Sequence, residues 1–263
     1  MTIGDPFDLV GDGQVGVVCI HGFTSTPYEV RYLGEKLAGA GFSVHGLLLP
    51  GHGTRVEDLD ATRWGDWVNA VEDAFDRMRM LCAKVALVGQ SLGGLLALHL
   101  ASRRSEVAAV ATLAAPLWLE GLGRRVAAWS RDGTLQRVLP RLRAIPKFTG
   151  SDVRDPRVRA ENPCYRSIPL RALGELSQFM DVVDASLPLI RQPVLVLHGQ
   201  QDHTAPVGCA YQIAERARAE RTRILPRSYH LLAVDVERDI VATEVIDFLR
   251  RTVTHHGDTA CAT

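Results

Sequence analysis

Short apolar stretches alternate with helix-forming stretches along most of this chain of 263 residues. The apolar stretches are of strand length and rich in valine, leucine and isoleucine, which favours β-strands buried on both faces. They lie at residues 15–20, 42–47, 84–88, 107–113, 193–199 and 221–225. The stretches between them predict helices at residues 27–40, 64–81, 94–101, 207–218 and 236–252. This alternation predicts an α/β fold in which helices cover both faces of a mostly parallel sheet.

Residues 117–186 interrupt the alternation, because no strand is apparent there and arginines are frequent. We expect a mostly helical insertion over the carboxyl edge of the sheet, called the cap below, that acts as a lid and substrate pocket. A helical excursion packed beside the sheet is the alternative. The core then comprises residues 1–116 and 187–254, and the small polar tail 255–263 is expected to be disordered. Prolines recur in the cap at Pro140, Pro146, Pro156, Pro163 and Pro169.

Composition limits the class of protein and its partners. The formal net charge is +0, so no basic excess is available to neutralise the phosphates of a nucleic acid. Five cysteines without C-x-x-C spacing support neither a disulfide framework nor a zinc site, and they fit a reducing cytoplasm. The first residues lack the pattern of a signal peptide, and no apolar stretch is long enough to span a bilayer. We expect a cytoplasmic protein, as a monomer or a homodimer.

Residues 89–93 read G-x-S-x-G and stand between a predicted strand and a predicted helix. This context turns a weak pattern into the prediction of a nucleophile elbow, in which a sharp turn presents Ser91 at the carboxyl end of the sheet. Gly89 and Gly93 have no Cβ atoms to clash where strand and helix pass closely. An ordinary glycine-bearing turn is the alternative interpretation.

A serine hydroxyl needs a base within hydrogen-bond reach and a third group that orients the base. In this architecture the partners follow in the order serine, acid, histidine. Asp202 comes just after a predicted buried strand, and His230 lies between the last short strand and the final helix. Position selects His230 among nine histidines. The alternatives are that Asp202 caps the following helix, or that Asp235 orients the base.

An oxyanion hole requires two backbone N–H groups. We expect one from Leu92, which follows the nucleophile, and one from Phe23 in the loop after the first core strand. The ring of Phe23 is also a candidate to line the acyl pocket. His52 is expected to support this loop by hydrogen bonding rather than to act in the chemistry. Three aromatic residues of the cap are further candidates for substrate contact: Trp118, Phe148 and Phe179.

Together these motifs resemble the bacterial monoacylglycerol lipases and small carboxylesterases of the α/β-hydrolase fold. The resemblance implies hydrolysis of carboxylic esters without a cofactor or metal, with Ser91, Asp202 and His230 as catalytic triad and with Phe23 and Leu92 as oxyanion donors. It also implies a small helical cap around an apolar tunnel. The residues that carry it are His21-Gly22-Phe23-Thr24, Pro50-Gly51-His52-Gly53-Thr54, Asp66-Trp67, Gly89-x-Ser91-x-Gly93-Gly94, Asp202-His203 and Ser228-Tyr229-His230.

The resemblance is thinner in the cap. Asp155-Pro156-x-Val158 and Tyr165-x-x-x-Pro169 fit the family, but Arg166 stands where an acidic residue facing glycerol is expected. The expected substrate is therefore a monoacylglycerol or another short- to medium-chain acyl ester. Transient contact of the cap with a lipid surface is a further expectation.

Several other activities share this set of residues. Dehalogenases and epoxide hydrolases of this fold use an aspartate nucleophile, so Ser91 argues against both. A thioesterase and a carbon–carbon bond hydrolase retain the serine and remain alternatives. From a different class, a non-catalytic small-molecule receptor on the same scaffold is also possible.

Overall fold

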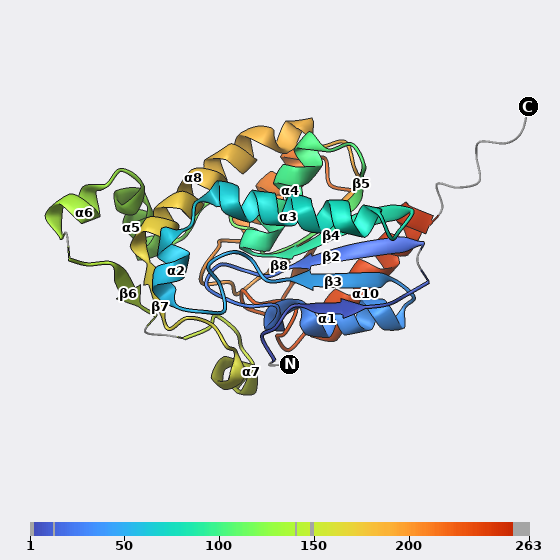
Figure 1. Cartoon of the computed structure of the whole chain (residues 1–263), viewed down its shortest axis with the longest axis horizontal. Helices are drawn as coiled ribbons and strands as arrows, with labels where there is room; N and C mark the ends of the chain where they lie inside the picture. The colour runs from blue at the N-terminus through green and yellow to red at the C-terminus, as the bar shows by residue number, and fades with distance from the viewer. Residues whose placement is uncertain (1–2, 13, 140, 148–149, 255–263) are drawn as a thin grey trace, which may run out of the picture.

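A mostly parallel sheet forms the centre of the molecule (Figure 1). The computed structural model describes residues 3–12, 14–139, 141–147 and 150–254. Seven strands pair in the order β1-β3-β2-β4-β5-β8-β9, and only β1 runs antiparallel to its neighbour. This confirms the predicted sheet. The strands are β1 (Phe7–Leu9), β2 (Val15–Ile20), β3 (Ser43–Leu47), β4 (Lys84–Gln90), β5 (Val107–Leu113), β8 (Val194–Gly199) and β9 (Arg221–Leu225).

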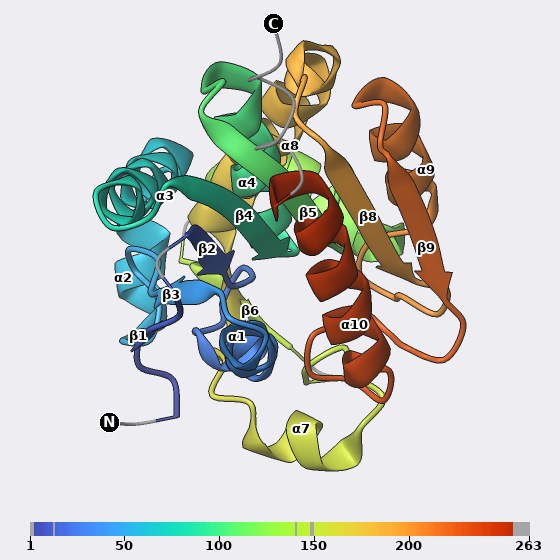
Figure 2. The same cartoon turned by 90° about the vertical axis from the view of Figure 1, so that its right-hand side faces the viewer.

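Helices cover the two faces of the sheet (Figure 2). One apolar cluster joins the sheet to α1 (Tyr28–Gly39) and α10 (Arg238–Leu249). The other joins it to α3 (Trp64–Arg79), α4 (Leu92–Arg103) and α9 (Gly208–Arg216). A short helix, α2 (Val56–Ala61), precedes α3, and the π-helical turn η2 (Arg250–Thr254) follows α10. The predicted helices are confirmed: α4 is longer than the predicted 94–101, and the other four are shorter than predicted. The short elements α2 and β1 were not predicted.

Successive side chains of β4 point to opposite faces of the sheet, and both sets are apolar, which explains why helices cover both faces. Val85 and Leu87 belong to the cluster under α3 and α4, and Ala86 and Val88 belong to the cluster under α1 and α10. All four are fully buried, and burying one valine or leucine side chain contributes about 1.5–3 kcal/mol. A strand apolar on both faces is stable only between two layers of helices.

The segment between β5 and β8 is mostly helical, as expected. It contains α5 (Gly121–Arg131), α6 (Thr134–Val138), α7 (Pro156–Glu161), α8 (Leu170–Ser186) and the 3₁₀ turn η1 (Leu187–Leu189). Two short strands that were not apparent in the sequence, β6 (Ala144–Pro146) and β7 (Ser167–Pro169), form a small antiparallel pair within it. Each strand has three residues, too few to show a period of two. The predicted tail 255–263 lies outside the described residues.

Candidate active site

Ser91 stands at the sharp turn between β4 and α4, with φ 55° and ψ −116°. Such a backbone costs of order 1–3 kcal/mol and persists only where the surroundings enforce it. Here a Cβ on Gly89 would lie 2.1 Å from the carbonyl carbon of Gly93, and a Cβ on Gly93 would lie 2.2 Å from the Ile20 carbonyl oxygen. Strand and helix therefore pass so closely that both positions require glycine.

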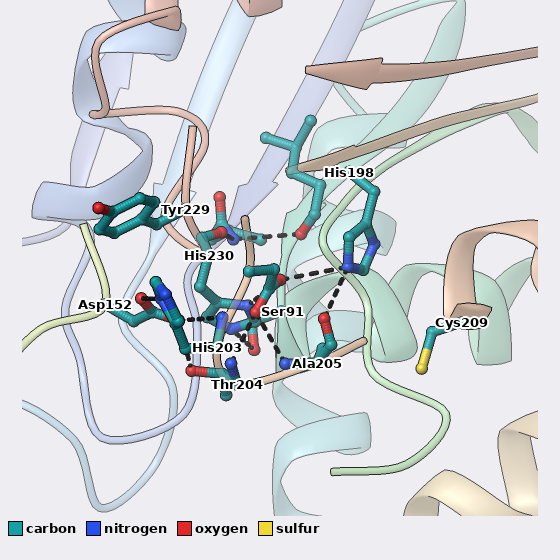
Figure 3. A network of polar contacts seen from close by, with 12 residues as sticks. Ser91, Asp152, His198, His203, Thr204, Ala205, Cys209, Tyr229 and His230 are labelled. Atoms are coloured by element: carbon teal, nitrogen blue, oxygen red, sulfur yellow. Dashed lines mark hydrogen bonds and ion pairs between the residues drawn. The ribbon is translucent and has the colours of Figure 1, made fainter. Parts of the chain in front are cut away.

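The three predicted triad residues meet in one hydrogen-bonded chain (Figure 3). Ser91 Oγ lies 2.8 Å from His230 Nε2, and His230 Nδ1 lies 2.7 Å from Asp202 Oδ2. The exposed fractions are 8% for Ser91, 9% for Asp202 and 5% for His230. Because Asp202 can only accept when ionised, Nδ1–H is the donor there, and Nε2 is left to accept the serine proton.

Asp202 has polar partners at both of its carboxylate oxygens. Its Oδ1 accepts from the N–H groups of Thr204 and Ala205, both at 2.8 Å, so the aspartate also shapes its own turn. Its Oδ2 accepts from His230 and lies 3.2 Å from His198 Nε2. His198 was not predicted as a site residue. Its position four residues before the acid, near the end of a buried strand, was the available signal.

The charges of Asp202 and His230 explain the direction in which each shifts the pKa of the other. Burial raises the pKa of Asp202, but the positive charge on His230 and hydrogen bonds from His198 and His230 outweigh this and hold it well below its usual range. Burial lowers the pKa of His230, but the charge and the hydrogen bond of Asp202 outweigh that and raise it above 6.5. Asp202 is therefore ionised at neutral pH, and it stabilises the imidazolium that proton transfer creates.

Gln90, next to the nucleophile, holds the loop of His230 in place. Its Nε2 donates to the carbonyl of His230 at 2.8 Å and to that of Leu113 at 3.2 Å, and its Oε1 accepts from Ala233 N–H at 3.4 Å. No sequence pattern pointed to this role, because the G-x-S-x-G pattern leaves the residue before the serine unspecified.

The loop of residues 21–26 lies directly against the nucleophile, since a Cβ on Gly22 would be 3.3 Å from Ser91 Cβ. Gly22 N–H donates to the buried carboxylate of Glu29 at 3.1 Å. Among the described residues, neither the N–H of Phe23 nor that of Leu92 has a protein acceptor. Both donors are therefore available to a ligand oxygen.

Two histidines support this loop in different ways. His21 Nε2 accepts from Leu49 N–H at 3.1 Å, so His21 joins the loops after β2 and β3. His52 was expected to do this by hydrogen bonding, but its Nδ1 donates to Pro50 in its own loop. Its ring packs instead against those of His21 and Phe23, at centroid distances of 5.0 and 6.3 Å. Burial lowers the pKa of His52 to about 4, so it is uncharged at neutral pH.

The aromatic residues predicted to contact the substrate differ in how deeply they are buried. Phe23 is half-buried and packs 5.9 Å from Trp67. Trp118 is half-buried and lies against Gly208 at the start of α9. Phe148 lies outside the described residues.

Phe179 is fully buried between Trp64 at 5.4 Å and His99 at 5.3 Å. It thus packs α8 against α3 and α4 and has no exposed surface for a substrate. The prediction for Phe179 is corrected to a core role, because at helical spacing an apolar core residue and a pocket residue look alike.

The cap contacts the loops around the serine through polar groups that were not predicted. Tyr165 N–H donates to the Thr24 carbonyl at 2.9 Å, and the Tyr165 hydroxyl donates to the Gly51 carbonyl at 2.7 Å. The Lys147 ammonium donates to the hydroxyl of Thr24. Arg166 is exposed, and its carbonyl accepts from Lys147 N–H at 2.9 Å.

Among the residues that the structure describes, no group of three or more His, Cys, Asp or Glu is arranged to hold a metal ion. None of the helices in the described ranges is long and apolar enough to cross a membrane.

A nucleophile elbow and a Ser–His–Asp chain on a mostly parallel, doubly covered sheet define the class of α/β-hydrolases. A family model described as "Serine aminopeptidase, S33" matches residues 13–237, and the chain belongs to this family. It is 30% identical over 249 residues to a thermostable monoacylglycerol lipase of Bacillus sp. (strain H-257), covering 94% of each chain. It is 26% identical over 249 residues to a carboxylesterase of Bacillus subtilis (strain 168), covering 94% of this chain and 96% of the relative.

A solved structure from work on the metagenome-derived lipolytic enzymes LipS and LipT resembles the whole chain. The TM-score is 0.85 at 25% sequence identity, and the match covers 94% of this chain and 98% of the other. The predicted α/β-hydrolase fold and the resemblance to monoacylglycerol lipases and carboxylesterases are thereby confirmed.

Proposed function

We propose that this protein is a serine hydrolase that cleaves carboxylic esters through an acyl-enzyme on Ser91. The observation that carries the proposal is the chain from Ser91 Oγ to His230 Nε2 at 2.8 Å and from His230 Nδ1 to Asp202 at 2.7 Å. The relatives named monoacylglycerol lipase and carboxylesterase support an ester as substrate.

In the proposed mechanism His230 Nε2 takes the proton of Ser91 as the serine oxygen attacks the ester carbonyl. The N–H groups of Phe23 and Leu92 donate to the oxyanion of the tetrahedral intermediate. His230 then protonates the departing alcohol, which leaves an acyl group on Ser91. A water molecule, deprotonated by His230, attacks the acyl-enzyme and releases the acid. Asp202 holds the imidazole in the required tautomer throughout.

The proposed substrate is a monoacylglycerol or another short- to medium-chain acyl ester, and the cap of residues 117–186 shapes its binding site. The monoacylglycerol lipase at 30% identity supports the first choice. The exposed Arg166 favours the second, because the acidic group expected to face glycerol is absent at that position.

We also propose that the cap makes transient contact with a lipid surface. Between residues 121 and 143 the chain has six arginines and one acidic residue, Asp132, although the whole chain is neutral. Leu122, Arg125 and Trp129 share one face of α5 at helical spacing, and both apolar side chains are exposed. A basic helix with exposed apolar residues is suited to the interface of an anionic membrane.

The test is steady-state turnover of monoacylglycerols, alkyl esters and thioesters of the same acyl chains, and an aminoacyl amide, with Ser91→Ala as blank. The ester proposal expects Ser91-dependent turnover of esters with the highest kcat/KM. A lead of monoacylglycerols among the esters would identify glycerol as the preferred alcohol. Preference for thioesters or the amide would contradict the ester assignment, and equal rates with Ser91→Ala would contradict the nucleophile.

A further inference from the structure

One cap residue, Asp152, is bonded to the loop that carries the triad acid. Its Oδ1 accepts from His203 Nδ1 at 2.8 Å, and its Oδ2 accepts from His203 N–H and from the Thr204 hydroxyl, both at 2.9 Å (Figure 3). His203 and Thr204 directly follow Asp202. The carboxylate of the cap thus fixes the backbone and one side chain of the acid loop.

Asp152 is also hydrogen-bonded to the loop that carries His230, the base of the triad. The carbonyl oxygen of Asp152 accepts from the N–H groups of His230 and Leu231, both at 3.1 Å. Asp202 and His230 are 28 residues apart in sequence and lie on separate loops. Asp152 therefore connects these two loops from outside the triad.

The neighbours of Asp152 hold it against the histidine loop. Val153 is fully buried in a small apolar cluster with Leu231 and Val234. The N–H groups of Arg154 and Asp155 donate to Asp235 Oδ1 at 3.0 and 3.1 Å. Residues 152–155, called the strap below, are therefore packed and hydrogen-bonded to the core.

Asp235 completes the junction between the strap and the histidine loop. Its Oδ2 accepts from Tyr229 N–H at 2.8 Å, so one carboxylate bonds both segments. This is a different role from that of Asp235 as a possible orienter of His230.

We propose that Asp152 is a positioning residue of the triad. By hydrogen-bonding the loop that carries Asp202 and the loop that carries His230, it fixes the separation of the Asp202 carboxylate and the His230 imidazole. The inference rests on the proposed function of these residues. Its physical basis is that a displacement of about 1 Å in a catalytic constellation can lower the rate about 100-fold. The contact with His203 matters here for geometry rather than stability, because the imidazole is 65% exposed and solvent screens such pairs.

Asp152 also acts on His230 by its charge. The negative groups that face His230 are Asp202 after β8, Asp152 in the cap and Glu29 at the start of α1, and each raises the pKa of the imidazole against the effect of burial. Removing the charge of Asp152 therefore lowers the pKa of His230. The acid limb of kcat/KM then moves to lower pH, since the base remains neutral further into acid.

The experiment compares Asp152→Asn and Thr204→Val with Asp155→Asn as matched control. Asp155 is a carboxylate of the same strap, but its side chain accepts from Arg157 N–H and Val158 N–H and caps α7. We measure kcat, KM, the pH profile and the thermal midpoint. We also measure the proton NMR signal of His230 Nδ1–H, which Asp202→Asn identifies by abolishing it and which requires no substrate.

For Asp152→Asn we expect kcat to fall about 10- to 100-fold with KM within about threefold of the wild type. The acid limb should move to lower pH, and the Nδ1–H signal should shift and exchange faster with water. Thr204→Val should change the same quantities in the same direction but by less. Asp155→Asn should lower only the thermal midpoint.

Two results would overturn the inference. One is a wild-type kcat, pH profile and Nδ1–H signal in Asp152→Asn. The other is that Asp155→Asn changes all three as much as Asp152→Asn, which would mean that the strap is only structural. Failure of the proposed function looks different, because no substrate would then show Ser91-dependent turnover while the NMR comparison still decides the role of Asp152.

Discussion

At the scale of the residue, a neighbouring carboxylate distinguishes His230 from the buried histidines His52 and His99. Burial lowers the pKa of His52 and of His99 to about 4, and neither donates to a carboxylate in a described hydrogen bond. Burial also disfavours the charged form of His230, but Asp202 reverses the direction. A buried imidazole can thus take up a proton at neutral pH only where a charge stabilises the product.

This difference predicts the pH dependence of the proposed activity. His230 must be neutral to accept the proton of Ser91, and its pKa is raised above 6.5. We therefore expect kcat/KM to rise with pH through a midpoint above 6.5, measured from pH 5 to 9 with circular dichroism to verify that the fold is retained. A midpoint clearly below 6.5 would mean that the charge of Asp202 does not control His230.

The acid of the triad gives a second prediction. Asp202→Asn keeps the shape but favours the wrong imidazole tautomer, so we expect kcat to fall about 10⁴-fold, as for the corresponding change in a serine protease. Asp184→Asn is the control, because Asp184 is a partly exposed carboxylate in an ion pair with Arg216 between α8 and α9. A loss of less than tenfold in Asp202→Asn would assign the orienting role elsewhere.

At the scale of the element, sequence patterns predicted the features that depend on residues close together in the chain. The strand, turn and helix around Ser91, the buried stripe of α3 and the loop positions of Asp202 and His230 could all be recognised in the sequence. The pair of β6 and β7 could not, because Ile145 pairs with Ile168 across the intervening α7. The roles of Gln90 and Asp152 depend on contacts with loops more than 50 residues away, which no periodicity records.

The contact between α4 and β2 predicts the cost of a single methyl group. A Cβ on Gly93 would lie 2.2 Å from the backbone oxygen of Ile20, which cannot move without disturbing β2. We expect Gly93→Ala to destabilise the protein by about 3 kcal/mol or more, measured by denaturant unfolding. Gly39→Ala is the control, because nothing lies within 4 Å of a Cβ at that position near the end of α1. Equal stability of the two variants would contradict the close approach.

At the scale of the whole molecule, charge and apolar surface are distributed unevenly. The arginine-rich part of the cap, with α5 and α6, lies at one end of the molecule, and the carboxyl end of α3, with Arg77 in its last turn, lies toward the other (Figure 1). A neutral protein can therefore present a basic, partly apolar end to a surface. The net charge alone could not predict this.

The proposed lipid contact of the cap predicts binding to vesicles that contain anionic phospholipid. Each arginine near such a surface contributes about 1 kcal/mol, so Arg124→Gln with Arg125→Gln should weaken binding by about 30-fold. Co-sedimentation with anionic vesicles, at low and high salt, measures this. Arg77→Gln with Arg103→Gln removes the same charge from the last turns of α3 and α4, outside the cap, and should bind as the wild type does. Equal losses for both pairs would contradict contact through the cap.

Direct pairing of β5 with β8, from Val110 opposite Val194 to Leu113 opposite Leu197, means that the sheet is continuous without the cap that separates these strands in sequence. Recombination at this point could exchange one cap for another and leave the order of the strands intact. Under the proposed role of Asp152, such an exchange is not free. A different cap must contain a residue of its own that hydrogen-bonds the loops of Asp202 and His230. Otherwise the new substrate pocket would lie above a misaligned triad. An exchange of the cap would then change the substrate range and the catalytic rate at the same time.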